Sequence, residues 1–357
     1  MTDKRNTRMA HLSQNTYTKA KNAILCLFMA RFDVITVGAA TQDIFLRSSA
    51  FEVTKDASAP DGVETCFPLG SKIGVDELIT ASGGGATNAA ATFAGLGLKT
   101  GCICRVGKDQ AGKIILKELK RRRISKKFVQ RDPRLPTATS IILLAGGGHR
   151  AILTYRGVSN ALRTDELPRK LKARWLYATS FGGDARLLRT MFEKAEQKKV
   201  KVAWNPGGRE LALGLTKLTM FLRITDVLIL NREEAALLSG KSAQDMRGLI
   251  KALKDLPRQA LTITDGQKGA YLCAEGKVWF APSLKAKRIN TTGAGDAFGS
   301  ALVTGLIHQL APEDALRLAM LNATSVVSHM GAKTGVLQNM PTEREMKRIR
   351  VKTIPIT

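Results

Sequence analysis

Short apolar segments alternate with helix-like or turn-like segments along most of the chain. The first, residues 32–37 (FDVITV), is rich in β-branched residues and ends at a glycine. Later segments of the same kind are KARWLYATS, KVKVAWN, TDVLIL and QALTITD. Buried strands that alternate with helices are typical of a mostly parallel sheet with helices on both faces. The pattern therefore predicts an α/β fold with a doubly wound sheet.

Two stretches break this alternation. Residues 44–81 contain strand-like pieces interrupted by prolines and glycines, with no clear amphipathic helix. Residues 137–156 have the pattern of a hairpin, because two apolar runs flank the glycines at 146–148. Strands from both stretches could form a small sheet over the C-terminal edge of the main sheet, where open α/β folds bind ligands. We predict that this small β-sheet is a lid.

We expect residues 31–345 to form this domain and residues 346–357 to form a C-terminal tail. Residues 1–30 carry five positive charges against one negative and end in a short apolar stretch. That stretch has no convincing cleavage site and runs directly into a strand, which favours a basic, disordered extension over a signal peptide. Met29 lies just before the first strand, so a translation start near Met29 is an open alternative.

Composition and charge narrow the class of protein. The chain has 357 residues and 44% of them are hydrophobic, so it can bury a substantial core. A formal charge of +26 favours anionic partners such as nucleotides, sugar phosphates or nucleic acid. The basic cluster at residues 117–127 closes an amphipathic helix, where positive charge suits the dipole. We interpret this cluster as a solvated surface and expect no specific nucleic-acid partner.

Hydropathy and cysteine usage bear on the compartment. No apolar run reaches about eighteen residues, so we expect no transmembrane helix and no membrane partner. The five cysteines are scattered, and the four histidines supply no matching metal-ligand spacing. This pattern fits buried, reduced thiols, and we expect a cytoplasmic protein.

The strongest chemical signal is residues 290–298, NTTGAGDAF, followed by a helix to about Leu310. Amides at a glycine-rich helix start converge on an anion, so Gly293, Ala294 and Gly295 could hold a transferred phosphoryl group. Asp296 could then take the proton from an attacking hydroxyl. The same residues also fit a helix N-cap after a glycine turn, and locally both interpretations stay open.

A second signal is residues 82–90, SGGGATNAA. Its three glycines permit a ligand to approach the backbone closely, and Asn88 offers a donor and an acceptor for hydroxyl groups. A tight turn with close helix packing would need the same glycines.

In this order, the two motifs resemble those of the ribokinase-like (PfkB) carbohydrate kinase family. Between them, residues 231–234 (NREE) are similar to the family's N-x-x-E element, and residues 264–269 (TDGQKG) to its nucleotide loop. The resemblance covers about residues 32–340. It implies a ribokinase-like fold and transfer of the γ-phosphoryl group from ATP, with Mg²⁺, to a hydroxyl group.

The resemblance also implies roles for individual residues. Asp43, Gly84 and Asn88 would bind the substrate. Glu234 would organise Mg²⁺ through its water shell, with Asn231 nearby. The ATP site would comprise Thr264, Gly266 and Gly269, with Asn205 reaching the phosphates. The alternatives are purely structural: Asp43 would form a turn, and Glu234 would be an ordinary charged residue in the first turn of a helix.

Two departures from the family pattern matter. Asn290 stands where the family usually has an aspartate beside a monovalent-cation site, so we expect weakened dependence on K⁺. Gly85 stands where several sugar and sugar-phosphate kinases have a lysine, which weakens the interpretation that the substrate is a sugar phosphate. The positive net charge of the chain favours that interpretation.

The leading substrate is a neutral sugar of the ribose or fructose type, and the alternative is a ribonucleoside. Aromatic residues in the lid could contact a base, or be lid core: Phe45, Phe51, Phe67 and Tyr155. A catalytically silent sugar or nucleotide sensor is a further alternative. No Walker A or protein-kinase motif occurs. An exposed lid edge could support a homodimer.

Overall fold

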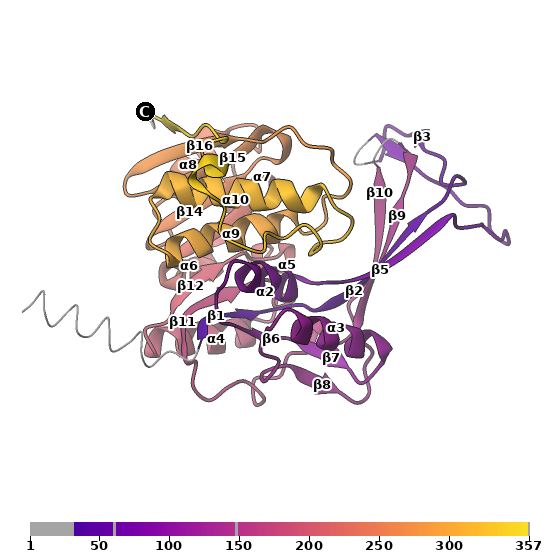
Figure 1. Ribbon diagram of the computed structural model, residues 1–357, viewed down its shortest axis with the longest axis horizontal. Helices are drawn as coiled ribbons and strands as arrows, with labels where there is room; N and C mark the ends of the chain where they lie inside the picture. The colour runs from indigo at the N-terminus through magenta and orange to yellow at the C-terminus, as the bar shows by residue number, and fades with distance from the viewer. Residues whose placement is uncertain (1–31, 60–61, 147–148, 356–357) are drawn as a thin grey trace, which may run out of the picture.

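The computed structural model describes residues 32–59, 62–146 and 149–355. A large α/β body carries a smaller β-sheet that projects from one side (Figure 1). The predicted N-terminal extension, and residues 147–148 in the turn of the predicted hairpin, lie outside the described residues.

The body contains a nine-stranded sheet in the order β17-β16-β15-β14-β13-β12-β11-β1-β6. The six strands from β6 to β14 pair in parallel, and β15, β16 and β17 add antiparallel strands at one edge. Their bounds are β1 (Phe32–Val37), β6 (Thr100–Ile103), β11 (Ala173–Ala178), β12 (Lys201–Trp204), β13 (Val227–Asn231), β14 (Ala260–Thr264), β15 (Gly269–Ala274), β16 (Lys277–Pro282) and β17 (Lys352–Ile354). The predicted mostly parallel sheet is confirmed.

Helices cover both faces of this sheet. The apolar side chains of the strands divide between two cores, and each core is shared with a different set of helices. One core includes side chains of α4, α6, α7 and α8, and the other includes side chains of α2, α9 and α10. The bounds are α2 (Gly85–Gly95), α4 (Ala185–Gln197), α6 (Leu215–Ile224), α7 (Arg232–Ser239), α8 (Met246–Leu253), α9 (Ala294–Ile307) and α10 (Pro312–Val327). The doubly wound architecture is therefore confirmed.

The antiparallel edge was not predicted. Strands β15 and β16 are joined by Glu275 and Gly276, whose φ angles of 49° and 71° are those of a tight hairpin turn. The segment expected to be a tail contributes β17, which pairs with β16. Both additions extend the sheet beside the nucleotide loop.

The apolar stretch TGCICRV, residues 100–106, is divided between two strands at Cys104. Its first half is β6, and its second half, β7 (Arg105–Gly107), pairs with β8 (Gln130–Asp132) in a separate small sheet. Cys102 and Cys104 are buried free thiols, as expected. Helix α3 (Gln110–Arg121) then ends in the basic cluster, as the sequence predicts.

The projecting sheet is the predicted lid. Its strands β2 (Thr41–Arg47), β5 (Glu77–Gly83), β9 (Ala138–Leu144) and β10 (Arg150–Tyr155) lie in the order β10-β9-β2-β5. Strands β9 and β10 form the predicted antiparallel hairpin. All residues of β10 are exposed, so this edge of the lid is uncovered in the chain.

The remaining elements are short. They are β3 (Thr54–Lys55), β4 (Val63–Glu64), η2 (Gly157–Asn160), α5 (Gly208–Leu211), η3 (Gly266–Lys268) and α11 (Glu343–Met346). Among the described residues, no helix combines the length and the apolar character that crossing a bilayer requires.

Candidate active site

The two glycine motifs meet through one hydrogen bond. Asn88, in α2, donates from Nδ2 to Oδ2 of Asp296, in the first turn of α9, at 2.8 Å. These residues are 208 positions apart in the chain. Gly293, and not Asp296, is the N-cap of α9, so the interpretation of Asp296 as an N-cap is wrong. The carboxylate instead faces the substrate motif.

The turn before α9 leaves room for an anion. Gly293 has a φ of 79°, and a side chain there would collide with Ala332, so only glycine fits. A Cβ on Gly295 would meet no atom within 4 Å. Gly295 and Ala294 both line an open pocket beside this turn. The positive end of helix α9, where its first amides lie, therefore faces free space.

Asp43 lies on the other side of the substrate motif. It belongs to β2, so the interpretation of Asp43 as a turn former is wrong. Its Oδ1 accepts a hydrogen bond of 3.0 Å from Oγ1 of Thr41. A side chain at Gly83 would collide with this carboxylate, and one at Gly84, with its φ of 93°, would collide with the Ala39 carbonyl. Close packing thus accounts for these two glycines, and it also places Asp43 beside the motif.

Burial sets the electrostatics of the two aspartates. It raises the pKa of Asp296, while the hydrogen bond from Asn88 and the charge of Lys333 lower it. Burial likewise raises the pKa of Asp43, and Lys333 again lowers it. A carboxylate with a raised pKa is a stronger base than an exposed aspartate, which suits proton abstraction.

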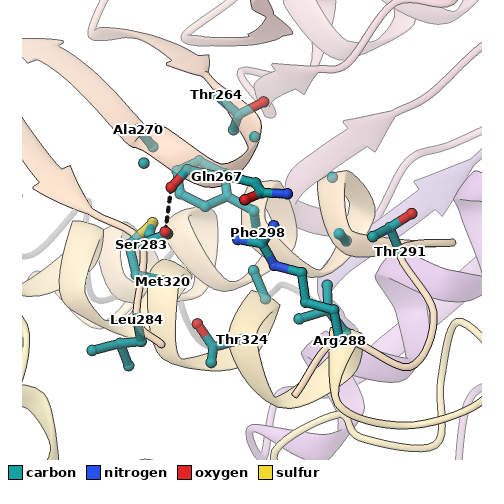
Figure 2. Close-up of a pocket in the computed structure, with 16 residues that line it drawn as sticks. Thr264, Gln267, Ala270, Ser283, Leu284, Arg288, Thr291, Phe298, Met320 and Thr324 are labelled. Carbon is teal, nitrogen blue, oxygen red and sulfur yellow. Dashed lines mark hydrogen bonds between the residues drawn. The ribbon is translucent and has the colours of Figure 1, made fainter. Parts of the chain in front are cut away.

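A cavity of about 260 Å³ lies between the nucleotide loop and helices α9 and α10. Thr264, Gly266 and Gly269 line it together with Ala294 and Gly295, as the resemblance implies. In Figure 2, the side chain of Arg288 extends into this cavity towards Gln267. The remaining lining is largely apolar: Ala270, Leu284, Phe298, Met320, Ala323 and Val327. Such a wall suits a flat heterocyclic ring.

Asn231 and Glu234 form the N-terminal capping box of α7. The Asn231 side chain accepts from the Glu234 amide at 2.7 Å, and Glu234 Oε2 accepts from the Asn231 amide at 2.8 Å. This bears out a first-turn helix role for Glu234. Burial raises the pKa of Glu234, and the nearby charge of Asp296 raises it further. Glu234 and Asn231 would hold Mg²⁺, a hard cation that prefers oxygen ligands and would offset the negative charge here.

The structure does not bring Asn205 into the nucleotide cavity. Its Nδ2 donates to the carbonyl of Ile229 at 3.0 Å, which links β12 to β13. Asn290 accepts from the Thr292 amide at 2.9 Å through Oδ1, and its buried Nδ2 has no hydrogen-bond partner among the described residues.

Sequence reasoning missed three cationic residues at the site. Arg150, on lid strand β10, donates a hydrogen bond to Thr291 in the loop before α9. Arg288 lines the nucleotide cavity. Lys333, after α10, is buried and interacts electrostatically with both Asp43 and Asp296. None of the three belongs to a local motif, although Arg150 follows the glycines of the predicted lid hairpin.

Comparison with known proteins agrees with this geometry. Residues 66–339 match the family described as pfkB family carbohydrate kinase. A fructokinase of Escherichia coli is 29% identical over 243 residues, which cover 64% of this chain and 78% of that enzyme. A mouse ribokinase is 25% identical over 286 residues, which cover 78% of this chain and 86% of that enzyme.

Solved structures with two kinds of ligand share the fold. A ribokinase of Arabidopsis thaliana complexed with ribose and ATP has a TM-score of 0.69 and 22% identity, covering 89% of this chain and 98% of that one. A Burkholderia thailandensis nucleoside kinase in complex with inosine has a TM-score of 0.68 and 21% identity, covering 88% and 96%. The described chain therefore has the fold of both sugar and nucleoside kinases.

Proposed function

Since the chain belongs to the pfkB family of carbohydrate kinases, we propose that it phosphorylates a hydroxyl group of a small neutral sugar of the ribose or fructose type. The observation that carries this proposal is the hydrogen bond between Asn88 and Asp296. It joins the substrate motif to the residue best placed to act as the base.

In the proposed reaction, the acceptor hydroxyl donates a hydrogen bond to the Asp296 carboxylate, next to Asn88. Asp296 takes the hydroxyl proton while the oxygen attacks the γ-phosphorus of ATP. The bond from that phosphorus to the bridging oxygen breaks, and ADP leaves with the electron pair. The amides of Gly293, Ala294 and Gly295 stabilise the charge on the transferring phosphoryl group. Asp43 accepts a hydrogen bond from another hydroxyl and fixes the orientation of the sugar.

Glu234, with Asn231 beside it, would hold Mg²⁺ through its water shell. The metal ion would neutralise charge on the ATP phosphates. The support on this chain is the proximity of Glu234 to Asp296, since each negative charge there disfavours the other. Asn205 stays a second candidate for contact with the phosphates; it does not line the cavity, and its Nδ2 donates to the carbonyl of Ile229.

We also propose that K⁺ activates this enzyme weakly or not at all. The oxygen of Asn290 already accepts from the Thr292 amide, and its other polar atom is a donor that cannot ligate a cation. A large rate increase on adding K⁺ to an assay free of sodium and potassium would refute this proposal.

A ribonucleoside is the second candidate acceptor. Phe45 and Phe51 are buried in the lid core. Phe67 packs against Phe51 with ring centroids 5.4 Å apart but is 37% exposed, and Tyr155 on β10 is 52% exposed, so these two rings are left to contact a base. The nucleoside kinases among the structural relatives are consistent with this alternative.

We propose that the lid edge binds a second copy of the chain. Leu153 and Ile152 on β10 are 58% and 47% exposed, and β10 has a lid neighbour on one side only. An uncovered strand with exposed apolar residues is a template for pairing. Leu153→Asp should shift the protein from dimer to monomer in sedimentation velocity, and a wild-type monomer would contradict the proposal.

The test of the main proposal is ATP consumption with Mg²⁺ across a panel of sugars, sugar phosphates and ribonucleosides. Asp296→Asn is the test variant. Asp245→Asn is its matched control, because Asp245 is the exposed N-cap of helix α8 and belongs to none of the motifs of the site. We expect one neutral sugar to give a signal that disappears only in Asp296→Asn. Nucleoside-dependent turnover would establish the alternative, and ATP binding with no turnover would indicate a silent sensor.

A further inference from the structure

A buried lysine bonds to the start of the substrate motif. Lys333 is only 4% exposed, in the segment that follows α10. Its Nζ donates to the backbone carbonyl of Ser82 at 2.6 Å and to the Ser82 hydroxyl at 3.0 Å. Ser82 directly precedes Gly83, the residue that packs against Asp43. Lys333 therefore bonds to the backbone at the end of β5, where the glycine turn of residues 83–85, here called the acceptor loop, begins.

These bonds belong to a closed ring of four residues. The Ser82 hydroxyl donates to Glu118 Oε2 at 2.8 Å, and Arg122 Nε donates to Glu118 Oε1 at 2.9 Å. Arg122 Nη2 donates a hydrogen bond of 2.9 Å to the carbonyl of Lys333, which closes the ring. The ring joins three segments that are far apart in the chain: the end of β5, the last turns of α3 and the segment after α10.

The neighbour of Lys333 contacts the other half of the site. Ala332 packs so closely against Gly293 that a side chain on that glycine would have no room. Gly293 begins the turn proposed to hold the phosphoryl group. Two consecutive residues, Ala332 and Lys333, thus touch the phosphoryl-binding turn and the acceptor loop.

We propose that Lys333 is a positioning residue, which holds the acceptor loop at a fixed distance from the phosphoryl-binding turn. This inference rests on the proposed kinase function of the same site. It explains why a charged side chain is buried there, since a backbone carbonyl, a hydroxyl and a carboxylate network all require a donor. It also gives the ring a role beyond stability, because transfer depends on the alignment of acceptor oxygen and phosphorus.

The electrostatic surroundings support this role. Burial lowers the pKa of Lys333 to about 8, although the neighbouring carboxylates oppose that shift. The charged form lowers the pKa of both Asp43 and Asp296 and so helps to keep them ionised. The titratable and charged groups that face Lys333 are Glu118 and Arg122 on α3, Asp43 on β2, Asp296 on α9, and Cys102 and Cys104 beside β6.

A buried ionic network can be purely structural, so the experiment must separate the two roles. Lys333→Met removes the charge and the hydrogen-bond donor and keeps an unbranched side chain that is one atom shorter. Arg105→Met is the matched control, because Arg105 is also buried and paired, with Asp132 at 2.7 Å, but does not touch the site. For each purified variant we would measure the thermal midpoint, kcat, and KM for the acceptor and for ATP.

If Lys333 positions the loop, kcat/KM for the acceptor should fall by about 100-fold in Lys333→Met, as displacements of about 1 Å do. KM for ATP should stay near the wild-type value. Arg105→Met should lower the thermal midpoint and leave both KM values unchanged. Acceptor kinetics in Lys333→Met equal to those of wild type would overturn the proposal.

Two further variants keep the test decisive. Should Lys333→Met fail to fold, Ser82→Ala removes only the side-chain bonds of the ring, and it should raise KM for the acceptor selectively. Lys333→Arg keeps the charge at high pH, and the ring lines a cavity of about 780 Å³ that can admit the larger group. Wild-type activity should decline as pH rises through about 8, and Lys333→Arg should resist that decline.

Identical alkaline profiles in wild type and Lys333→Arg, or unchanged acceptor kinetics in Ser82→Ala, would contradict the positioning role. A wild-type protein with no acceptor-dependent turnover on the full panel would instead overturn the proposed kinase function, and this inference with it.

Discussion

The nucleotide cavity and the acceptor loop meet at the first turn of α9, yet they are built from different contacts. Sixteen residues line the cavity, and Arg288 is the only charged one among them. The acceptor side is built around three charged residues, of which Asp43 and Lys333 are buried and Asp296 is half-buried. Apolar walls recognise a ligand mainly by shape, whereas buried charges must each have a partner in the correct place. We therefore expect activity to be more sensitive to substitutions on the acceptor side of the site than to substitutions in the nucleotide cavity.

The variant with the largest expected effect lies where the two halves meet. Asp296→Asn removes the proposed base and keeps its size, so kcat should fall by about 10²- to 10⁴-fold. Neither KM should change much, because the residue is proposed to act on the transferred proton. Steady-state kinetics against the Asp245→Asn control would measure this. A variant that retains wild-type kcat would remove the proton-abstraction step from the mechanism.

A smaller effect should isolate the acceptor half. Asp43→Asn removes the charge that accepts a hydrogen bond from the sugar, and kcat/KM for the acceptor should fall by about 10- to 100-fold. KM for ATP should be unaffected, since Asp43 does not line the nucleotide cavity. Equal losses for both substrates would show that the two halves are not separable in this way.

The converse change should isolate the nucleotide half. Thr324→Trp, on α10, would fill part of the cavity and raise KM for ATP by about tenfold, leaving KM for the acceptor unchanged. Thr190→Trp on α4 is the matched control, since Thr190 is likewise a threonine within a helix but lies outside the cavity. ATP kinetics unaffected by Thr324→Trp would show that the cavity is not the nucleotide site.

The same contrast decides what the sequence could predict. Thr264, Gly266 and Gly269 lie within one short motif, so the nucleotide loop was predictable from local residues. Lys333 pairs with Ser82 across 251 positions, and no local pattern marks such a partner. Asn205 was predicted to reach the phosphates, and no sequence signal indicated that its Nδ2 donates to a carbonyl of β13.

The fold shows a similar division. The parallel strands of the body were predictable because each is a compact apolar run. The β15–β16 hairpin was missed, although Gly276 lies between two apolar runs and was a usable turn signal. Strand β17 has only three residues, two of them polar and exposed, and its place is fixed by pairing with β16.

The two halves should also differ in their response to acid. Burial raises the pKa of both Asp43 and Asp296, so protons bind to them at a higher pH than to ordinary aspartates. Activity requires the ionised base, and kcat should therefore decline as pH falls through this raised range. Folding responds oppositely: a carboxyl group whose pKa is raised in the folded state stabilises the fold when protonated, and this contribution is lost as pH rises.

Mild acidification should thus remove activity while the thermal midpoint holds or rises, and ATP binding in the cavity, which no carboxylate lines, should persist. Parallel profiles of kcat, thermal midpoint and ATP affinity against pH would measure this. A loss of activity that coincides with unfolding or with loss of ATP binding would mean that the acid-sensitive groups are not the buried aspartates of the acceptor side. A decline in kcat alone would place them there, where the fold keeps two carboxylates charged at some cost to its own stability.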